Sequence, residues 1–239
     1  MTASTAADSA RRIADALDLL RSRVPLQRRV GHAGDVLFRA GERFNTLYVL
    51  NTGFVKTVNG ADDGREQVVG LHLKGDWLGF DGIAAGTHRC DAVAMDTGEI
   101  WALKYDDLMA ACRREPALLD LLHAEMSREI ARERETMLSL CTLPADARVA
   151  EFLRAWADAL AQRGLRTDQI TLRMTRAEIG NYLGMTLETV SRALSRLARG
   201  DVIRFAEKGR REIQIPEVGA LSAFVRRSVG AGMATVAMH

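Results

Sequence analysis

Residues 175–197, "TRAEIGNYLGMTLETVSRALSRL", constrain the fold more than any other stretch, because two helix starts lie within one short segment. Thr175 and Glu178 form a Thr-x-x-Glu capping box, the signature of a helix N-terminus. Thr186 has the kind of side chain that caps a second helix, and Gly184 between them suits the left-handed residue that ends a helix. Two short helices joined by a tight turn with glycine predict a helix-turn-helix.

The second helix of this pair, residues 186–199, has two different faces. Glu188, Ser191 and Arg192 are spaced i, i+3 and i+4, so they share one side of the helix. The opposite side is apolar and carries Val190, Leu194 and Leu197. Taken alone, this pattern fits an ordinary solvated amphipathic helix with a Glu–Arg pair.

In a helix-turn-helix, however, the second helix enters the major groove of DNA with its N-terminal residues at the base edges. There Glu188 can accept a hydrogen bond from cytosine N4, and Arg192 can donate to guanine O6 and N7. Ser191 is short enough for a close backbone or thymine contact. We therefore predict that these three residues read bases.

A basic hairpin follows the helix pair. The stretch "DVIRFAEKGRREIQIP" predicts two strands joined at Lys208–Gly209, which would form a wing. Any single basic residue here is ordinary solvated surface, but the helix pair and the wing together indicate DNA binding. The candidate phosphate contacts are Thr175, Arg176, Arg196, Arg199, Lys208, Arg210 and Arg211.

Composition bounds the remaining possibilities. The chain has 239 residues and a net charge of only +2, so a nucleic-acid surface must come from local clustering of charge. Cys90, Cys112 and Cys141 contain no C-x-x-C pair, which argues against a disulfide framework or a zinc ribbon and fits a reducing cytoplasm. No window has the length of a membrane span. We expect a cytoplasmic protein that does not enter a membrane.

The pattern along the chain divides an α+β protein into four zones. Residues 1–24 predict an N-terminal arm with a frayed start and a short amphipathic helix. Residues 25–110 hold short β-like runs with turn signals about every ten residues, which predict an antiparallel β-roll, barrel or sandwich. Residues 111–143 are predicted to form a dimerisation helix, and residues 144–239 a winged helix-turn-helix domain with a mobile tail from residue 226.

The long helix expected after Pro116 carries an apolar stripe with heptad-like spacing, and its opposite face is charged. Such a helix can pack on its own β-domain, but the charged flanks favour pairing with a second copy. We predict a homodimer seam formed by Leu119, Leu122, Met126, Ile130, Glu133, Met137 and Leu140. Glu133 is the one seam position without an apolar side chain.

These features resemble a known family, the CRP/FNR transcription regulators, on the FNR side. The E-x-x-S-R of Glu188, Ser191 and Arg192 looks like the FNR reading triplet, whereas CRP-type readers carry an arginine where Leu187 stands. The stretches "LFRAGERFNTLYVLNTGFVKTV", "GREQVVGLHLKGDWLGFDGIAAG" and "ADARVAEFL" are similar to FNR-like stretches in the same order. The resemblance implies a β-roll sensor of the cyclic-nucleotide-binding type, a long dimer helix and a C-terminal winged helix.

The resemblance also implies partners and a control point. Expected partners are double-stranded DNA with TTGAT…ATCAA half-sites, a second copy of the chain, and RNA polymerase, which a loop similar to "ADDGRE" contacts in related activators. Glu133 matches an acidic residue that disfavours dimers in FNR-type regulators. Arg132 and Arg134 flank it and can relieve part of the repulsion by pairing across the seam.

Departures from the family pattern bear on the cofactor. FNR-type oxygen sensors hold an iron–sulfur cluster with cysteines in the N-terminal arm, but the first cysteine here is Cys90, and three scattered thiols fall short of four ligands. Cyclic-nucleotide binders use a Gly-Glu and an Arg-Ser or Arg-Thr pair, where this chain has Phe80 and Arg89-Cys90. Phe80, Asp81, Arg89 and Cys90 are therefore only a weak candidate effector pocket. We expect no iron–sulfur cluster and no metal site, while haem binding stays open.

Two alternatives remain beside a homodimeric DNA-binding regulator. One is a cyclic-nucleotide-responsive regulator of the same fold. The other is a cupin-type metal enzyme, which needs a His-x-His pair with a nearby carboxylate, whereas this β-zone has isolated histidines only. The cupin hypothesis leaves the helix pair without a role, so we predict that the chain is not an enzyme.

Overall fold

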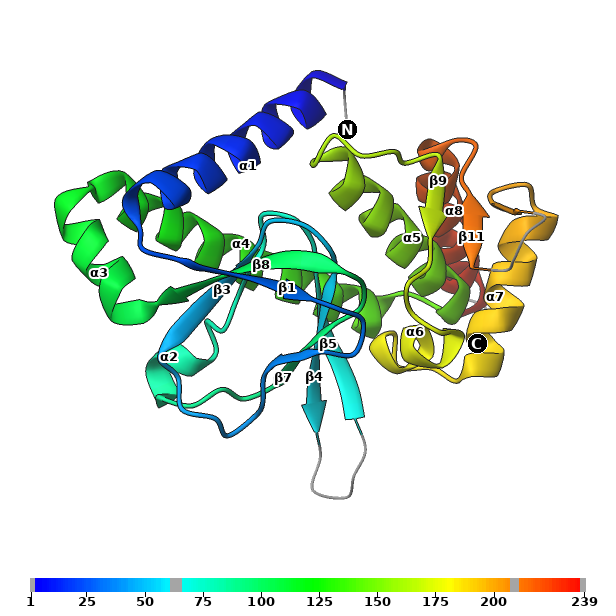
Figure 1. The fold of residues 1–239 in the computed structure, drawn as a ribbon. Coiled ribbons are helices and arrows are strands. Elements are labelled where there is room, and N and C mark those ends of the chain that lie inside the picture. The colour runs from blue at the N-terminus through cyan, green and yellow to red at the C-terminus, as the bar shows by residue number, and fades with distance from the viewer. Residues whose placement is uncertain (1–2, 61–65, 207–210, 237–239) are drawn as a thin grey trace. The chain divides into compact units, whose positions relative to one another are not determined.

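The computed structural model describes residues 3–60, 66–206 and 211–236, and the chain forms two compact units (Figure 1). One unit comprises residues 11–133, and the other combines residues 1–10 with residues 134–239. Lys208, Arg210, the Lys208–Gly209 turn and most of the "ADDGRE" tip lie outside the described residues.

Two antiparallel four-stranded sheets build the unit of residues 11–133. The first has the order β1-β8-β3-β6, with β1 (Gln27–Gly31), β8 (Gly98–Lys104), β3 (Thr46–Leu50) and β6 (Trp77–Leu78). The second has the order β2-β7-β4-β5, with β2 (Val36–Phe38), β7 (Asp91–Ala94), β4 (Val55–Gly60) and β5 (Glu66–His72). Apart from the hairpin of β4 and β5, neighbouring strands are far apart in sequence, as in a roll, and the β-roll prediction is confirmed.

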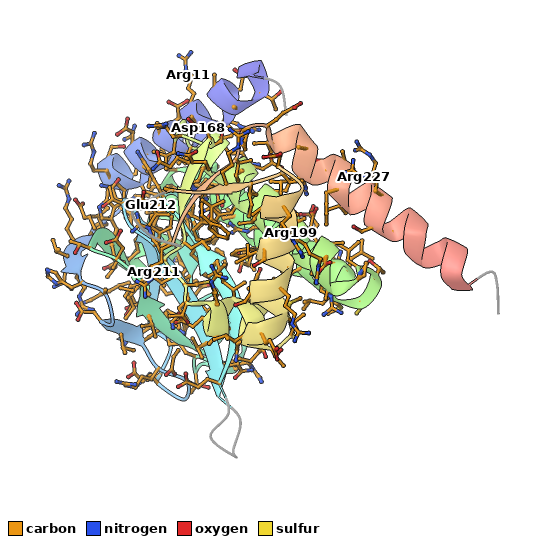
Figure 2. All side chains as sticks on the ribbon, turned by 90° about the vertical axis from the view of Figure 1, so that its right-hand side faces the viewer. Arg11, Asp168, Arg199, Arg211, Glu212 and Arg227 are labelled. Atoms are coloured by element: carbon orange, nitrogen blue, oxygen red, sulfur yellow. The ribbon has the colours of Figure 1, made fainter. Side chains whose placement is uncertain are left out.

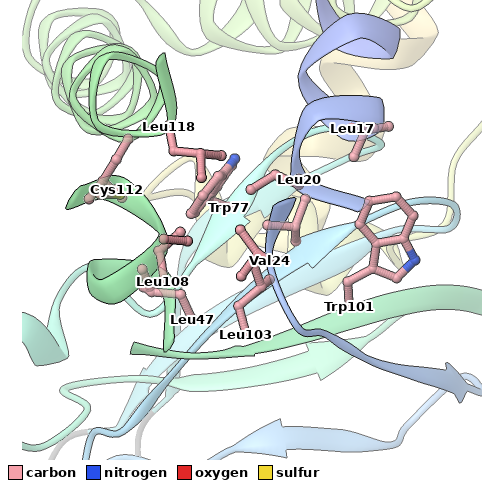
Figure 3. Close-up of a cluster of buried hydrophobic side chains, with 13 residues drawn as sticks. Leu17, Leu20, Val24, Leu47, Trp77, Trp101, Leu103, Leu108, Cys112 and Leu118 are labelled. Atoms are coloured by element: carbon pink, nitrogen blue, oxygen red, sulfur yellow. The ribbon is translucent and has the colours of Figure 1, made fainter. Parts of the chain in front are cut away.

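The N-terminal helix α1 (Ala3–Arg23) contributes to the core of this unit. Leu17, Leu20 and Val24 are buried with Trp77 and Trp101 of the first sheet (Figure 3). Leu108, Cys112 and Leu118 from the following helices complete the cluster. The second half of the arm is therefore part of the core of residues 11–133. The expected frayed start is wrong from Ala3 onward, because the helix already includes that residue.

Three helices follow the strands or interrupt them. They are α2 (Gly82–Ala85), α3 (Tyr105–Arg114) and α4 (Pro116–Thr142). Pro116 begins α4, as its place in a first helical turn predicts. Residues 111–114, which were assigned to the dimerisation helix, instead form the last turn of α3.

The unit containing residues 134–239 is mainly helical. Its elements beyond the end of α4 are α5 (Ala145–Ala161), β9 (Gln169–Thr171), α6 (Arg176–Tyr182), α7 (Leu187–Arg199), β10 (Arg204–Phe205), β11 (Glu212–Gln214) and α8 (Val218–Val236). The strands form a three-stranded antiparallel sheet in the order β10-β11-β9. The tail expected to be mobile from residue 226 is helical to Val236, because α8 packs along α5 through residues such as the buried Leu221.

None of the helices described here is both long enough and apolar enough to cross a membrane.

Candidate nucleic-acid interface

Two capped helices present the candidate reading surface. Thr175 caps α6 by accepting a hydrogen bond from the Glu178 backbone N–H at 3.1 Å, while the Glu178 carboxylate accepts from the Thr175 backbone N–H at 2.7 Å. This is the predicted capping box. Thr186 caps α7 by accepting from the backbone N–H of Thr189 at 3.2 Å. Both helices therefore begin where the sequence places them.

The turn between α6 and α7 depends on two glycines. Gly184 has a φ of +63°, the left-handed conformation that a glycine adopts without strain. A Cβ at Gly180 would lie 2.5 Å from the carbonyl oxygen of Met185, so only glycine lets the turn approach α6 this closely. Arg148 of α5 donates to the carbonyl oxygens of Leu143 and Leu183, at 2.9 and 3.0 Å. The helix pair is thus fixed to α5 at the start of the turn.

The two faces of α7 are separated as the sequence predicts. Val190, Ala193, Leu194 and Leu197 are buried. Glu188 and Arg192 are on the other side, with side chains that are 70% and 67% exposed, and they form an ion pair at 2.5 Å. The pair is worth only about 0.3–0.5 kcal/mol. Both side chains can therefore exchange this partner for a base edge at small cost.

Two more residues lie on the first two turns of α7. Ser191 is half-buried, and its carbonyl oxygen accepts from the Ser195 hydroxyl at 2.8 Å. Leu187, the first residue of α7, is 53% exposed although it is apolar. An exposed apolar side chain at the N-terminus of such a helix suits a thymine methyl group. Helical spacing alone places Leu187 beside the predicted readers, although the sequence analysis uses Leu187 only to distinguish FNR-type from CRP-type readers.

The described phosphate candidates differ in how exposed their side chains are and in the contacts that these side chains already make. Arg199 at the end of α7 and Arg211 before β11 are exposed (Figure 2). The guanidinium of Arg176 lies over the ring of Phe205 at 5.6 Å, a cation–π contact that holds it near the strands. The hydroxyl of Thr175 already donates to Glu178 at 2.9 Å, so a phosphate would compete with the capping box.

Arg196 does not fit its predicted role. Its guanidinium donates two hydrogen bonds to the carboxylate of Asp146 on α5. Hydrogen bonding to Asp146 raises the pKa of Arg196, and the carboxylate balances its charge. Because a bidentate arginine–carboxylate pair satisfies the guanidinium, we reassign Arg196 from phosphate binding to joining α7 to α5.

The stripe of α4 divides between the core and the surface. Leu122 is buried in the core of residues 11–133, and Met126 packs partly against the same core. Leu122 therefore cannot lie in a dimer seam, and its assignment was wrong. Ile130 and Met137 are 46% and 65% exposed. The exposed His123 completes a strict alternation of three and four residues: Leu119, His123, Met126, Ile130, Glu133, Met137 and Leu140.

Arg132 also differs from its expected role. Its guanidinium donates to Asp76 at 2.7 Å and to Glu129 at 2.6 Å. Burial alone would lower the pKa of Arg132, but these carboxylates outweigh burial and raise it. The expectation that Arg132 pairs across a seam was therefore wrong for this conformation, because the side chain is held within its own chain.

The candidate effector residues form a site unsuited to a cyclic nucleotide phosphate. The carboxylate of Asp81 accepts from the backbone N–H of Arg89 at 2.6 Å and from the thiol of Cys90 at 3.5 Å. An anion placed at Arg89-Cys90 would thus be repelled by the Asp81 carboxylate, which already accepts hydrogen bonds from both of these donors. Phe80 stacks on Trp77 with ring centroids 5.9 Å apart, and it offers no acceptor to a ribose.

The thiols do not fit an iron–sulfur cluster. Burial, together with the charge and hydrogen bond of Asp81, raises the pKa of Cys90 to about 12, so its thiol stays protonated. Cys112 lies in the apolar core, where burial also raises the pKa of its thiol. A standard cluster needs four ligands, whereas the chain has three cysteines, which lie far apart in the sequence. Across residues 3–60, 66–206 and 211–236, no group of three or more histidine, cysteine or acidic side chains is placed to hold a metal ion.

Two family descriptions match separate parts of this chain. Residues 28–115 match the cyclic nucleotide-binding domain, which includes both sheets. Residues 147–224 match the Crp-like helix-turn-helix domain, which includes α6 and α7.

Whole-chain relatives are similar to this protein over most of their length. The fumarate and nitrate reduction regulatory protein of Salmonella typhimurium is 35% identical over 210 residues, 87% of this chain and 81% of the relative. The electron transport regulator A of Shewanella oneidensis is 33% identical over 191 residues, 80% of this chain and 74% of the relative. Among solved structures, FixK2 from Bradyrhizobium japonicum is 29% identical with a TM-score of 0.75, over 84% of this chain and 97% of that one.

Proposed function

The chain belongs to the CRP/FNR family of DNA-binding transcription regulators, and we propose that it binds DNA as a homodimer at inverted repeats with TTGAT and ATCAA half-sites. One observation carries this proposal. Glu188 and Arg192 are exposed on the first two turns of a helix whose start is fixed by a side-chain cap. In a helix-turn-helix, that place on the second helix faces the base edges.

The chemistry of the three predicted readers matches such a half-site. Arg192 donates two hydrogen bonds to guanine O6 and N7, and Glu188 accepts from cytosine N4. Their mutual ion pair at 2.5 Å keeps both side chains extended before DNA is bound. Ser191 makes the close contact, and Leu187 packs against a thymine methyl. Arg176, Arg199 and Arg211 supply phosphate contacts that fix the helix in the groove.

The homodimer is supported by the exposed positions on α4. Ile130 and Met137 are large apolar side chains in water, one heptad apart. Together with Met126 and Leu140 they give a narrow stripe with coiled-coil spacing. An inverted repeat requires two reading helices about one turn of DNA apart, roughly 34 Å, and a homodimer supplies two such helices. RNA polymerase is the further partner that we propose, as for other regulators of this type.

A cyclic nucleotide is not the favoured effector, because the Asp81 carboxylate already accepts from the Arg89 backbone N–H and the Cys90 thiol, the donors that a phosphate would need. The resemblance to FNR-type oxygen sensors implies an iron–sulfur cluster, but the three cysteines of this chain, the first of which is Cys90, do not supply its four ligands. We therefore propose a sensor that uses neither group. We propose that the chain acts in the cytoplasm, where a DNA-binding regulator meets its DNA and RNA polymerase.

Fluorescence anisotropy with a labelled TTGAT…ATCAA duplex tests this proposal. The wild-type protein should prefer the duplex over one with the guanine changed. Arg192→Ala should cost roughly 1–3 kcal/mol on the first duplex and abolish that preference. Arg173→Ala, on the same unit but outside α7, is the matched control and should keep the preference. An unchanged preference in Arg192→Ala would mean that α7 does not read this base.

A further inference from the structure

Helix α4 carries a second stripe of side chains beside the proposed dimer seam, the alternation that runs from Leu119 to Leu140. Its members each come directly before a position of that alternation and are buried or bonded within their own chain: Leu118, Leu122, Glu125, Glu129 and Arg132. Leu118 and Leu122 are in the core of residues 11–133, and Arg132 donates to Asp76 at 2.7 Å. One edge of the seam is therefore already held by the chain itself.

The spacing of the seam assigns heptad positions to its neighbours. Ile130 and Met137 are one heptad apart and occupy position a, and Glu133 occupies position d. Glu129, directly before Ile130, is then at position g, and Arg134, directly after Glu133, is at position e. In a parallel pair of helices, each g residue faces the e residue of the next heptad on the other helix, where interhelical salt bridges form. Glu129 of one copy thus faces Arg134 of the other, once on each side of the pair.

The remaining pairs of this kind within α4 are uncharged. They join Leu122 with Ser127, and Thr136 with Cys141. Glu129 with Arg134 is therefore the pair of opposite charges that α4 can form in this arrangement. Since charges at e and g positions set the choice of partner and the orientation of coiled coils, this pair favours two parallel helices in register.

The two side chains are prepared for such a contact in different ways. Arg132, itself bonded to Asp76, donates to one oxygen of Glu129, Oε2, at 2.6 Å. This bond holds the Glu129 carboxylate in place, and a carboxylate can accept from a second guanidinium as well. The Glu129 side chain remains 22% exposed. Arg134 is exposed, and it forms no ion pair within the described part of its own chain. A fixed acceptor and a free donor are thus available on each copy.

We propose that Glu129 of each copy binds Arg134 of the other, and that these two ion pairs set the parallel orientation of the α4 helices and the choice of a second copy as partner. The proposal rests on the homodimer proposed above and names the contact that selects it. Glu133 is one helical turn from Glu129, so the same cation also offsets part of the repulsion expected at Glu133.

Mixing two charge-reversed full-length chains tests this pair. An Arg134→Glu homodimer would bring Glu129 against a glutamate, and a Glu129→Arg homodimer would bring Arg134 against an arginine. A mixed dimer of the two variants has opposite charges at both contacts. Random pairing would make half of the dimers mixed. We expect about 80% or more, because each exchanged contact changes the equilibrium by about twofold. Native mass spectrometry counts the species when one variant carries a mass tag.

Two controls separate this effect from a general change of charge. Glu135→Arg makes the same reversal on α4 outside the e and g positions, so its mixture with Arg134→Glu should stay at half mixed dimers. Salt at about 1 M should move the first mixture toward half, because it screens exposed ion pairs. A preference that depends on both variants and on salt cannot come from a merely structural role of either residue.

A second set of variants covers the case that Glu129→Arg does not fold, since it loses the bond from Arg132. Glu129→Gln keeps an acceptor for Arg132. In the wild type it should raise the dimer dissociation constant about twofold, because it removes an attraction at both contacts. In the Arg134→Glu background it should lower the constant about twofold, because it removes a repulsion. Sedimentation velocity over a dilution series measures both constants.

The outcomes distinguish this pair from the homodimer itself. If the wild type dimerises but the charge-reversed chains mix at random, the pair is refuted, and an effect of Glu129→Gln with the same sign in both backgrounds refutes it too. A wild type that stays monomeric at all concentrations refutes the homodimer, and the pair with it.

Discussion

Replacing Glu133 by leucine should tighten the proposed dimer without any effector. Glu133 stands between Ile130 and Met137 in the alternation of three and four residues along α4. In a parallel pair, its twin faces it at the same level. Arg132, which could neutralise the two carboxylates, is held by Asp76 and Glu129 in its own chain. The charge at the seam is therefore compensated only in part.

The size of the effect follows from the geometry of two packed helices. Helix axes lie about 8–10 Å apart, which puts facing carboxylates roughly 7 Å from each other. Their repulsion is then about 0.6 kcal/mol in water and about 2.4 kcal/mol at an effective dielectric constant of 20. Burial of the leucine side chain adds about 1 kcal/mol. Together these give roughly 2–3 kcal/mol, or a dimer dissociation constant lowered about 30- to 150-fold.

The same carboxylate predicts how the dimer responds to pH. Partial burial, and then the charges of Glu129 and Asp81, raise the pKa of Glu133, while Arg132 opposes the shift. A raised folded pKa means that the folded chain holds this proton to a higher pH than the unfolded chain does. The stability that Glu133 contributes is present below its pKa in the unfolded chain and is lost as the pH rises through its pKa in the folded chain. Dimerisation adds a second carboxylate, so the wild-type dimer should tighten as pH falls through this window.

Sedimentation velocity over a dilution series measures both effects. Glu135→Leu is the matched control, because it makes the same change on the same helix two positions away, outside the alternation. It should leave the dimer dissociation constant within about threefold of the wild type, as for an ordinary surface change. Glu133→Leu should also lose the pH response. Equal constants for the wild type and Glu133→Leu would refute the seam and move control of DNA binding to domain orientation.

Three further predictions concern other residues. Arg196→Ala should leave the salt dependence of DNA binding unchanged, because the Asp146 carboxylate already holds its guanidinium. Arg211→Ala should reduce the slope of log K against log salt concentration by about one. Fluorescence anisotropy at several salt concentrations measures both effects. Gly180→Ala should lower the free energy of unfolding by about 1–3 kcal/mol, since the new Cβ would be 2.5 Å from a carbonyl oxygen. Urea denaturation measures this change. Gly200→Ala is the control, because the nearest atom to its new Cβ would be 3.6 Å away. Cys90 should react with iodoacetamide at neutral pH far more slowly than the exposed thiol of α4, because its pKa is about 12; mass spectrometry of the labelled protein would contradict this if both reacted equally.

Local signals in the sequence predicted the helix pair well. A capping box, a cap and a turn glycine depend on residues within a few positions of each other, so Thr175, Thr186 and Gly184 could be assigned without knowing the rest of the fold. The exposed stripe of α7 followed from helical spacing alone. For the same reason, Pro116 marked the start of α4.

Long-range contacts decided what the sequence left open. Asp146 is 50 residues from Arg196, and Asp76 is 56 residues from Arg132, so no spacing rule pairs them. Leu122 is apolar, as a residue of a dimer seam would be, and only the packing of α4 shows that it is buried in the core of residues 11–133 instead.

The local caps of α6 and α7 have a consequence for how this regulator can diverge after gene duplication. The start of α7 is set by Thr186 and the turn by Gly180 and Gly184, none of which belongs to the exposed reading stripe. Substitutions at Glu188 or Arg192 therefore leave the scaffold of the domain intact. A duplicated copy can acquire a new promoter preference through one or two codons, while its paralogue keeps the old one.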